Sequence, residues 1–247
     1  MSGHSKWSTI KHKKGALDKK RGKIFTKLIK EITVAAKEGG TDVDANARLR
    51  LAVQNAKGKN MPKDTIERAI KKVDGGDAAD YLEITYEGYG SNGAAIFVEC
   101  TTDNINRTVA DVRSYFTKYD GSLGTNGSLE FIFDRRGVFI IPIEEGMDED
   151  ELTMELIDGG AEDVVFENEF ITVTTAMEDF GNMNSKLEEL KLEAESASLE
   201  RIPNTLVTLG NDVFKTTMRL IEALEDNDDV QKVYHNIDAT DEQIESL

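Results

Sequence analysis

The chain has few of the residues that build disulfides, rigid linkers or metal sites. Its 247 residues include one cysteine, three prolines and three histidines. A single Cys100 excludes an internal disulfide and a cysteine-rich metal site. No apolar run approaches the roughly 18 residues that a membrane-spanning helix needs, and no apolar stretch follows the basic N-terminus as it would in a secretory signal. The composition predicts a soluble, cytoplasmic protein of two or three domains, with no metal, cofactor or membrane contact.

Charge is distributed unevenly along the chain. Residues 1–30 contain ten Lys or Arg and one acid, a net of +9, although the whole chain carries −17. Residues 1–72 carry +12 and residues 73–247 carry −29. This concentration of cations predicts a nucleic acid as the partner, because a dense array of phosphates stabilises many cations placed together. The acidic remainder repels nucleic acid and leaves a protein partner at the acidic domains open.

The candidate nucleic-acid contacts are the basic side chains at the start of the chain. They are consecutive at 11–14 and 19–21, and glycines at 15 and 22 let the backbone approach phosphates. Such contacts position a protein without reading base sequence. Trp7 either stacks on a base or packs on the helices, and packing is favoured. The candidates are Lys6, Lys11, His12, Lys13, Lys14, Lys19, Lys20, Arg21, Lys23 and Lys27.

Apolar residues at three- and four-residue steps predict three helices in the first 78 residues. The first covers 17–38 and ends at a pair of glycines. The second is capped by Asp42 or Asp44 and ends near Lys57. The third starts at Asn60 and Pro62. Short connections between them predict a small three-helix domain at 1–78.

The pattern then changes to a mixture of strands and helices. Strands are expected at 81–87, 94–100, 128–133 and 138–143, with a helix at about 104–119 and a turn at 134–137. From 137 the expected order is strand, helix (148–158), strand, strand, helix (177–194), strand, as in a ferredoxin-like unit. A last helix at 210–226 and a strand at 230–237 need a partner sheet, and the nearest incomplete one lies at 80–133. The predicted fold class is therefore α+β, with a three-helix domain at 1–78, a discontinuous α+β domain at 79–134 plus 204–247, and an inserted ferredoxin-like α+β domain at 135–203.

No stretch assembles a catalytic or metal site. Gly88–Gly93 matches the string GxGxxG, but a strand follows it instead of a helix, so it is interpreted as a hairpin connection. Cys100 ends an apolar strand, which is typical of a buried small hydrophobe. The acidic clusters 144–151 and 225–229 lack the spacing of a calcium loop and are interpreted as solvated surface. No nucleophile, base and oxyanion site come together, so neither catalytic residues nor an enzyme is predicted.

Several motifs carry a family resemblance in the same order along the chain. They are Gly3–Trp7, Asp18–Lys27, Asn60–Ile70, Tyr86–Gly90 and Thr102–Thr108. Over nearly the full length the chain resembles the YebC family, with Ser91-Asn92-Gly93 where the family often has Pro-Gly-Gly. The resemblance implies an N-terminal helical domain and two α+β domains, one of them discontinuous.

The same resemblance implies a regulator of gene expression. Some bacterial members are described as DNA-binding transcriptional regulators, and this is the function we expect, with the basic N-terminal domain on DNA. Others, including the mitochondrial translational activator of cytochrome c oxidase, act on the ribosome. The alternative is thus a ribosome-associated translation factor that contacts ribosomal RNA through the same residues. Because no presequence precedes the family's first motif, a bacterial cytosolic member is expected. The oligomeric state stays open.

Overall fold

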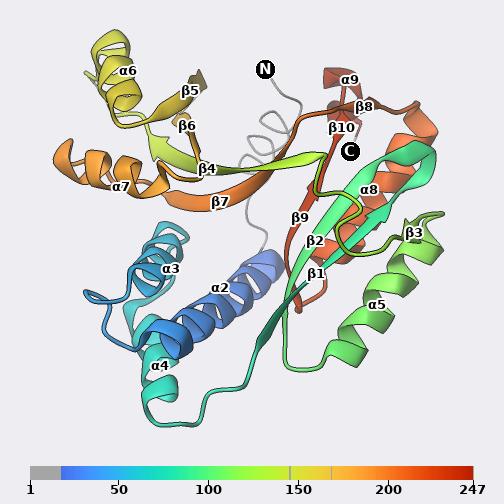
Figure 1. Ribbon diagram of the computed structural model, residues 1–247, viewed down its shortest axis with the longest axis horizontal. Coiled ribbons are helices and arrows are strands. Elements are labelled where there is room, and N and C mark those ends of the chain that lie inside the picture. The colour runs from blue at the N-terminus through green and yellow to red at the C-terminus, as the bar shows by residue number, and fades with distance from the viewer. Residues whose placement is uncertain (1–17, 145, 168, 247) are drawn as a thin grey trace. The chain divides into compact units, whose positions relative to one another are not determined.

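The computed structural model describes residues 18–144, 146–167 and 169–246, which form an α+β protein with a helical start (Figure 1). The first helices are α2 (Asp18–Gly39), α3 (Ala47–Gly58) and α4 (Lys63–Asp74). Two four-stranded sheets follow within the described residues, and their mapped pairings are antiparallel. The predicted fold class is confirmed.

The chain divides into two compact units. The first comprises the chain up to Val34, Ala78–Asp134 and the chain from Ile202 onward. The second comprises Ala35–Asp77 and Arg135–Arg201. The boundary between them falls inside α2. The domain boundaries drawn from the sequence stay predictions.

The sheet of the first unit has the strand order β3-β1-β2-β9. β1 (Leu82–Tyr89) and β2 (Ala95–Thr102) form a hairpin through a short turn at Ser91–Gly93, which confirms the hairpin interpretation of the glycine-rich string. In that turn Gly93 has a φ of +79°, a conformation that glycine adopts without strain. β3 (Ser122–Leu123) lies on the outer side of β1, and β9 (Val230–His235) pairs with β2. The segments before and after the ferredoxin-like unit therefore share one sheet.

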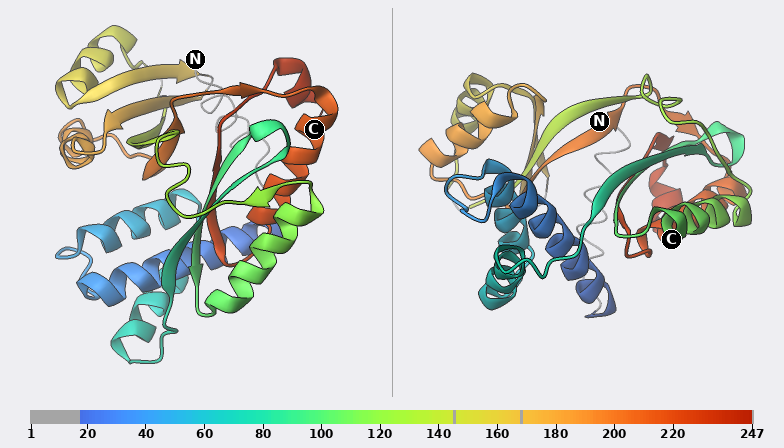
Figure 2. Two further views of the ribbon diagram at one scale, coloured as in Figure 1. Left: turned by 45° about the vertical axis from the view of Figure 1, so that its right-hand side comes forward. Right: turned by 60° about the horizontal axis from the view of Figure 1, so that its bottom comes forward.

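Each face of this sheet is covered by different elements. Helices α5 (Ile105–Lys118) and α8 (Asn211–Glu225) pack on one face and lie side by side in both views of Figure 2. Strand alternation directs Ile96 and Val98 toward these helices. Ala95 and Phe97 point to the opposite face, where residues 129–133 cover them. The short strands β8 (Val207–Thr208) and β10 (Ile237–Asp238) and the helix α9 (Asp241–Glu245) complete the described chain.

The sheet of the second unit has the order β5-β6-β4-β7, which is the strand order of a ferredoxin-like unit. Its buried core joins the sheet to the two helices that follow in this part of the chain, with Leu156 from the first and Met183 and Leu187 from the second. The elements are β4 (Phe133–Pro142), α6 (Glu149–Asp158), β5 (Ala161–Glu167), β6 (Phe170–Ala176), α7 (Phe180–Glu189) and β7 (Ser196–Pro203). The predicted ferredoxin-like arrangement is confirmed.

The predicted strand at 128–133 and the turn at 134–137 are wrong. Residues 128–132 form turns, and β4 runs without a break from Phe133 through Gly137. The glycine serves close packing, because a Cβ atom on it would lie 2.8 Å from Cδ2 of Phe180. Glycine inside a strand often marks such a close approach.

Two helix boundaries also differ from the prediction. Asn46, not Asp42 or Asp44, caps α3, since its Oδ1 accepts a hydrogen bond from the Leu49 amide at 3.0 Å. The same amide side chain donates to the backbone carbonyls of Ala35 and Gly40, which Asp cannot do. The helix expected at 177–194 is α7, which covers only Phe180–Glu189.

Candidate nucleic-acid interface

The structure places only part of the predicted contact set. Lys6, Lys11, His12, Lys13 and Lys14 lie outside the described residues. Lys19 and Lys20 belong to the first turn of α2. Arg21 is exposed, and its guanidinium carbon lies 5.4 Å from the centroid of the Phe25 ring. Whether these side chains contact nucleic acid stays a prediction.

Lys23 and Lys27 contact the end of α8. Lys23 Nζ donates to the carbonyl of Asp226 at 2.9 Å and lies 3.1 Å from its carboxylate. Lys27 Nζ donates to the carbonyl of Glu225 at 2.7 Å. The last carbonyls of a helix lack partners in the helix and carry partial negative charge. An ammonium group placed there donates hydrogen bonds to these carbonyls and is attracted by the negative end of the helix dipole. Both lysines thus have a structural partner within the first unit.

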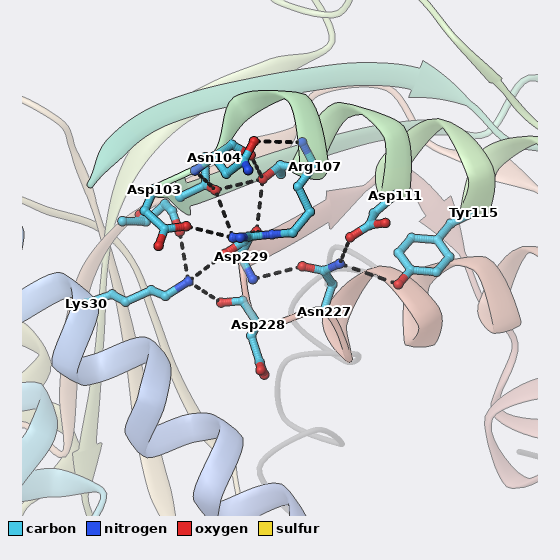
Figure 3. Close-up of polar contacts among 12 residues, drawn as sticks. Lys30, Asp103, Asn104, Arg107, Asp111, Tyr115, Asn227, Asp228 and Asp229 are labelled. Carbon is cyan, nitrogen blue, oxygen red and sulfur yellow. Dashed lines mark hydrogen bonds and ion pairs between the residues drawn. The ribbon is translucent and has the colours of Figure 1, made fainter. Parts of the chain in front are cut away.

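Lys30 continues the same helical stripe into a buried charge cluster (Figure 3). Its Nζ lies 2.8 Å from Oδ1 of Asp229 and donates to the carbonyls of Asp228 (2.8 Å) and Thr101 (3.1 Å). The Lys30 and Asp229 side chains are only 8% and 6% exposed. A buried ammonium group needs a partner of negative charge and an acceptor for each of its N–H groups, and Lys30 has both.

The second oxygen of Asp229 receives three donors from the start of α5. Arg107 donates from Nη2 at 2.6 Å and from Nε at 3.1 Å, and the hydroxyl of Thr108 donates at 3.0 Å. Arg107 Nη2 also donates to Asp103 at 2.8 Å, and these acidic partners raise the pKa of the guanidinium. The cluster therefore connects α2, α5 and the segment between α8 and β9.

The turn before β9 is held on α5 by a neighbouring amide. Asn227 Nδ2 donates to the carboxylate of Asp111 at 3.2 Å and lies 3.4 Å from the hydroxyl of Tyr115 (Figure 3). Its Oδ1 accepts from the Asp229 amide at 2.8 Å. These contacts fix the backbone that presents the Asp229 carboxylate.

The sequence interpretation missed this cluster. The acidic run 225–229 was expected to be solvated, and that is wrong for Asp229, which is 4% exposed. The motif Thr102–Thr108 had no assigned role; it contains the N-cap Asn104 and the donors Arg107 and Thr108. The available signal was the spacing of Lys23, Lys27 and Lys30, which puts them on one helix stripe.

The charge of Asp229 has a consequence for acid stability. Burial raises the pKa of the Asp229 carboxyl, but hydrogen bonds from Lys30, Arg107 and Thr108 lower it more, so the pKa lies below its ordinary value. Such a group stabilises the fold above its unfolded-state pKa, and that stabilisation is lost as the pH falls through the folded-state pKa. We expect the gap in urea midpoint between the wild type and Asp229→Asn to be constant above about pH 5 and to narrow below about pH 4. A gap that stays constant down to about pH 2 in a series of urea titrations would contradict this role.

A second buried carboxylate, Glu87, organises the segment after β3. It is 3% exposed and accepts hydrogen bonds from the amides of Gly127 (2.7 Å) and Leu129 (2.6 Å). The Ser128 hydroxyl lies 3.4 Å from the same carboxylate, and the Glu87 carbonyl accepts from the Gly124 amide at 2.8 Å. These donors explain why residues 128–132 form turns in spite of their apolar pattern.

Cys100 is buried, which confirms its interpretation as a small hydrophobe. Burial, with a contribution from Asp229, raises the pKa of its thiol to about 12. The thiol is thus protonated at neutral pH and is a poor nucleophile. Within the described ranges, no group of three or more His, Cys, Asp or Glu residues is placed to hold a metal ion. None of the helices described is both long enough and apolar enough to span a membrane.

These features define an α+β protein with a helical start and antiparallel sheets. Its cationic helix α2 is bound by ion pairs to the segment after α8. Residues 5–76 match the TACO1/YebC protein N-terminal domain, and residues 81–237 match the TACO1/YebC second and third domain. The chain belongs to the TACO1/YebC family.

Curated relatives and a solved structure agree with this assignment. A protein of Amoebophilus asiaticus named "Probable transcriptional regulatory protein" is 54% identical over 239 residues, which is 96% of this chain and 98% of that protein. A protein of the same name from Geotalea uraniireducens is 54% identical over 248 residues, which cover both chains fully. The crystal structure of a conserved hypothetical protein from Aquifex aeolicus has a TM-score of 0.83 and 41% identity, with 92% of this chain and 94% of that chain covered.

Proposed function

We propose that this protein is a nucleic-acid-binding regulator of gene expression that acts in the cytoplasm and binds DNA through its basic N-terminal region. The observation that carries the proposal is the charge division, +12 over residues 1–72 and −29 over the rest. The basic part attracts a phosphate backbone. The acidic part repels the nucleic acid, so the nucleic acid contacts the basic part of the protein. The names of the relatives support a regulatory role.

The contacts of α2 support two different roles for the cations of the basic segment. Lys23, Lys27 and Lys30 hold the helix on the first unit. The cations before them are the ones we assign to the phosphate backbone, with Arg21 exposed next to that set. The proposal includes no catalytic step, and the one thiol of the chain, Cys100, is buried and protonated.

One observation favours a second candidate, a ribosome-associated translation factor on ribosomal RNA. A helix that reads DNA bases needs Arg, Asn or Gln side chains that are available to the groove. On α3 these side chains have partners within the second unit: Gln54 donates to the Ala194 carbonyl, and Asn55 exchanges two hydrogen bonds with the Ala197 backbone at 3.0 Å. Arg48 forms an ion pair with Glu38. Backbone contact without base reading suits an RNA surface as well as a DNA duplex.

A competition experiment separates the two candidates. Labelled promoter DNA is bound to the full chain at physiological salt and challenged with random DNA of equal length and with purified ribosomes. For a sequence-specific regulator we expect random DNA to compete at least about 10³-fold less well than the promoter. Equal competition by random DNA contradicts sequence-specific regulation. If ribosomes displace the labelled promoter at a lower concentration than random DNA requires, the result supports the translation factor instead.

A further inference from the structure

Helix α6 of the second unit exposes two large apolar side chains on its outer side. The helix lies beside β5, the end strand of the sheet (Figure 1). Leu156 is fully buried and Leu152 packs against the same core, so these two leucines define the inner side of the helix. Met154 and Ile157 are 63% and 56% exposed, and because positions three apart are neighbours on a helix, they form one apolar strip. Such a strip with a polar border is typical of an interaction site.

Acidic side chains form the border of this strip. Asp150, Glu151 and Asp158 lie three or four positions from Met154, which makes them its neighbours on the surface of the helix. All three are exposed. The apolar strip of α6 is therefore bordered by carboxylates on the side of the helix that faces away from the sheet.

The chain around α6 is acidic without any compensating base. Residues 137–185 contain fourteen Asp or Glu and no Lys or Arg. The next base, Lys186 of α7, forms an ion pair with Glu155 on α6. A surface of one sign attracts a partner of the opposite sign and repels phosphates. The charge around the strip therefore disfavours nucleic acid and fits a cationic partner.

The partner must satisfy both parts of this surface. A metal ion or a small amine supplies positive charge but leaves the apolar strip in water. A helix with apolar residues at three- and four-residue steps and lysines on either side supplies both, as in complexes where an amphipathic helix lies on an apolar surface. The flexible thioether of Met154 can adapt to the shape of such a helix.

We propose that the outer side of α6 binds a lysine- or arginine-rich amphipathic helix of another protein. The apolar side of that helix covers Met154 and Ile157. Its cations face the carboxylates of Asp150, Glu151 and Asp158. The inference goes beyond the proposed function, because the site lies wholly within the second unit and does not use the basic segment.

The test measures binding of a labelled basic peptide to the full chain by fluorescence anisotropy. The probe has the repeated heptad Lys-Leu-Ala-Lys-Leu-Ala-Lys, which places its leucines along one side of a helix. A second peptide of equal charge has alanine at each leucine position.

The apolar strip is changed by Met154→Gln with Ile157→Gln, because Gln is a good helix former. The control is Met177→Gln with Ile143→Gln, which changes the same residue types at other exposed positions of the unit. We expect the first variant to bind the leucine peptide at least about tenfold more weakly than the wild type, and the control to bind it unchanged. The alanine peptide is expected to bind the wild type at least about tenfold more weakly than the leucine peptide. Far-ultraviolet circular dichroism confirms that the variants are folded.

A second pair of variants tests the carboxylates of the border. Asp150→Asn with Asp158→Asn removes two charges beside the strip. Asp163→Asn with Glu169→Gln removes two exposed charges elsewhere in the same unit. We expect the first variant to lower the affinity for the leucine peptide at least about threefold and to reduce its dependence on salt, and the second to change both less.

The outcomes that overturn the inference are distinct. Equal binding of the two peptides, or equal losses in a variant and its control, would show only diffuse attraction by negative charge. Self-association of the wild type in sedimentation velocity that is lost in Met154→Gln with Ile157→Gln would assign the strip to a second copy of the chain. Absence of peptide binding up to about 1 mM also overturns the inference. None of these variants changes the basic segment, so failure here leaves the proposed function intact.

Discussion

Replacing Asp229 by alanine is expected to lower the free energy of unfolding by about 3–5 kcal/mol, the range for removal of one partner from a buried ion pair. The substitution leaves the Lys30 ammonium in a site where its side chain is only 8% exposed. Arg107 loses two hydrogen bonds, but its side chain is 46% exposed and regains water. Most of the loss therefore comes from the lysine, together with the Thr108 hydroxyl that donates to the same carboxylate.

Urea denaturation measures this loss, and Asp226→Ala is the matched control. Asp226 also pairs with a lysine of α2, but its side chain is 68% exposed and that of Lys23 is 41% exposed. An exposed pair contributes about 0–1 kcal/mol, so the control is expected to change the urea midpoint little. Equal losses in the two variants would contradict the assignment of the buried cluster as the main attachment of α2. If the dependence of the unfolding free energy on urea concentration changed in either variant, its transition would no longer be comparable with that of the wild type.

Charge reversal at Lys13, Lys14, Lys19 and Lys20 is expected to weaken nucleic-acid binding by at least about 10²-fold at physiological salt. Each cation that neutralises a phosphate releases condensed counterions, so the affinity falls with salt in proportion to the number of such contacts. Loss of four contacts lowers the slope of log affinity against log salt by about 3–4. Fluorescence anisotropy with labelled duplex DNA and single-stranded RNA at several salt concentrations measures both quantities.

The control for this prediction changes the same number of charges elsewhere in the basic region. Lys57, Lys63, Lys71 and Lys72 are exposed on α3 and α4. Reversal of these four alters the net charge of the chain equally, yet we expect a smaller loss of affinity and a nearly unchanged salt slope. Equal losses in the two sets would mean that diffuse charge attracts the nucleic acid. Unchanged affinity and slope in the first set would contradict a role for the N-terminal basic segment.

Periodicity alone identified most helices and strands. Helix α2 was expected at 17–38 and occurs at Asp18–Gly39, because an apolar face at three- and four-residue steps is a local property of the sequence. The ferredoxin-like unit was recognised from element order, since six consecutive elements with short connections leave few alternative topologies. The charge division, and with it the expectation of a polyanion partner, also needs no coordinates.

The errors arose where a distant residue overrides the local pattern. Residues 128–133 are apolar enough for a strand, but the Glu87 carboxylate accepts hydrogen bonds from the amides of Gly127 and Leu129, and the segment turns instead. The run Asp134–Gly137 is typical of a turn, yet it lies inside β4, where Gly137 pairs with Thr175 of β6 and leaves room for the Thr175 and Phe180 side chains. Neither contact is visible in a window of neighbouring residues.

By itself, the sequence determined the α+β class, the order of the elements and the separation of basic from acidic regions, since each depends on composition or on periodicity over a few turns. Only the tertiary structure decided which of the charged side chains have a structural partner. Lys30 and Asp229 are 199 positions apart, and no local rule distinguishes that lysine from its neighbours on the helix. The pairing of β9 with β2 places Asp229 next to Thr101, and Lys30 of α2 binds both. Burial then couples the two charges, because a charge removed from water needs a partner of opposite sign.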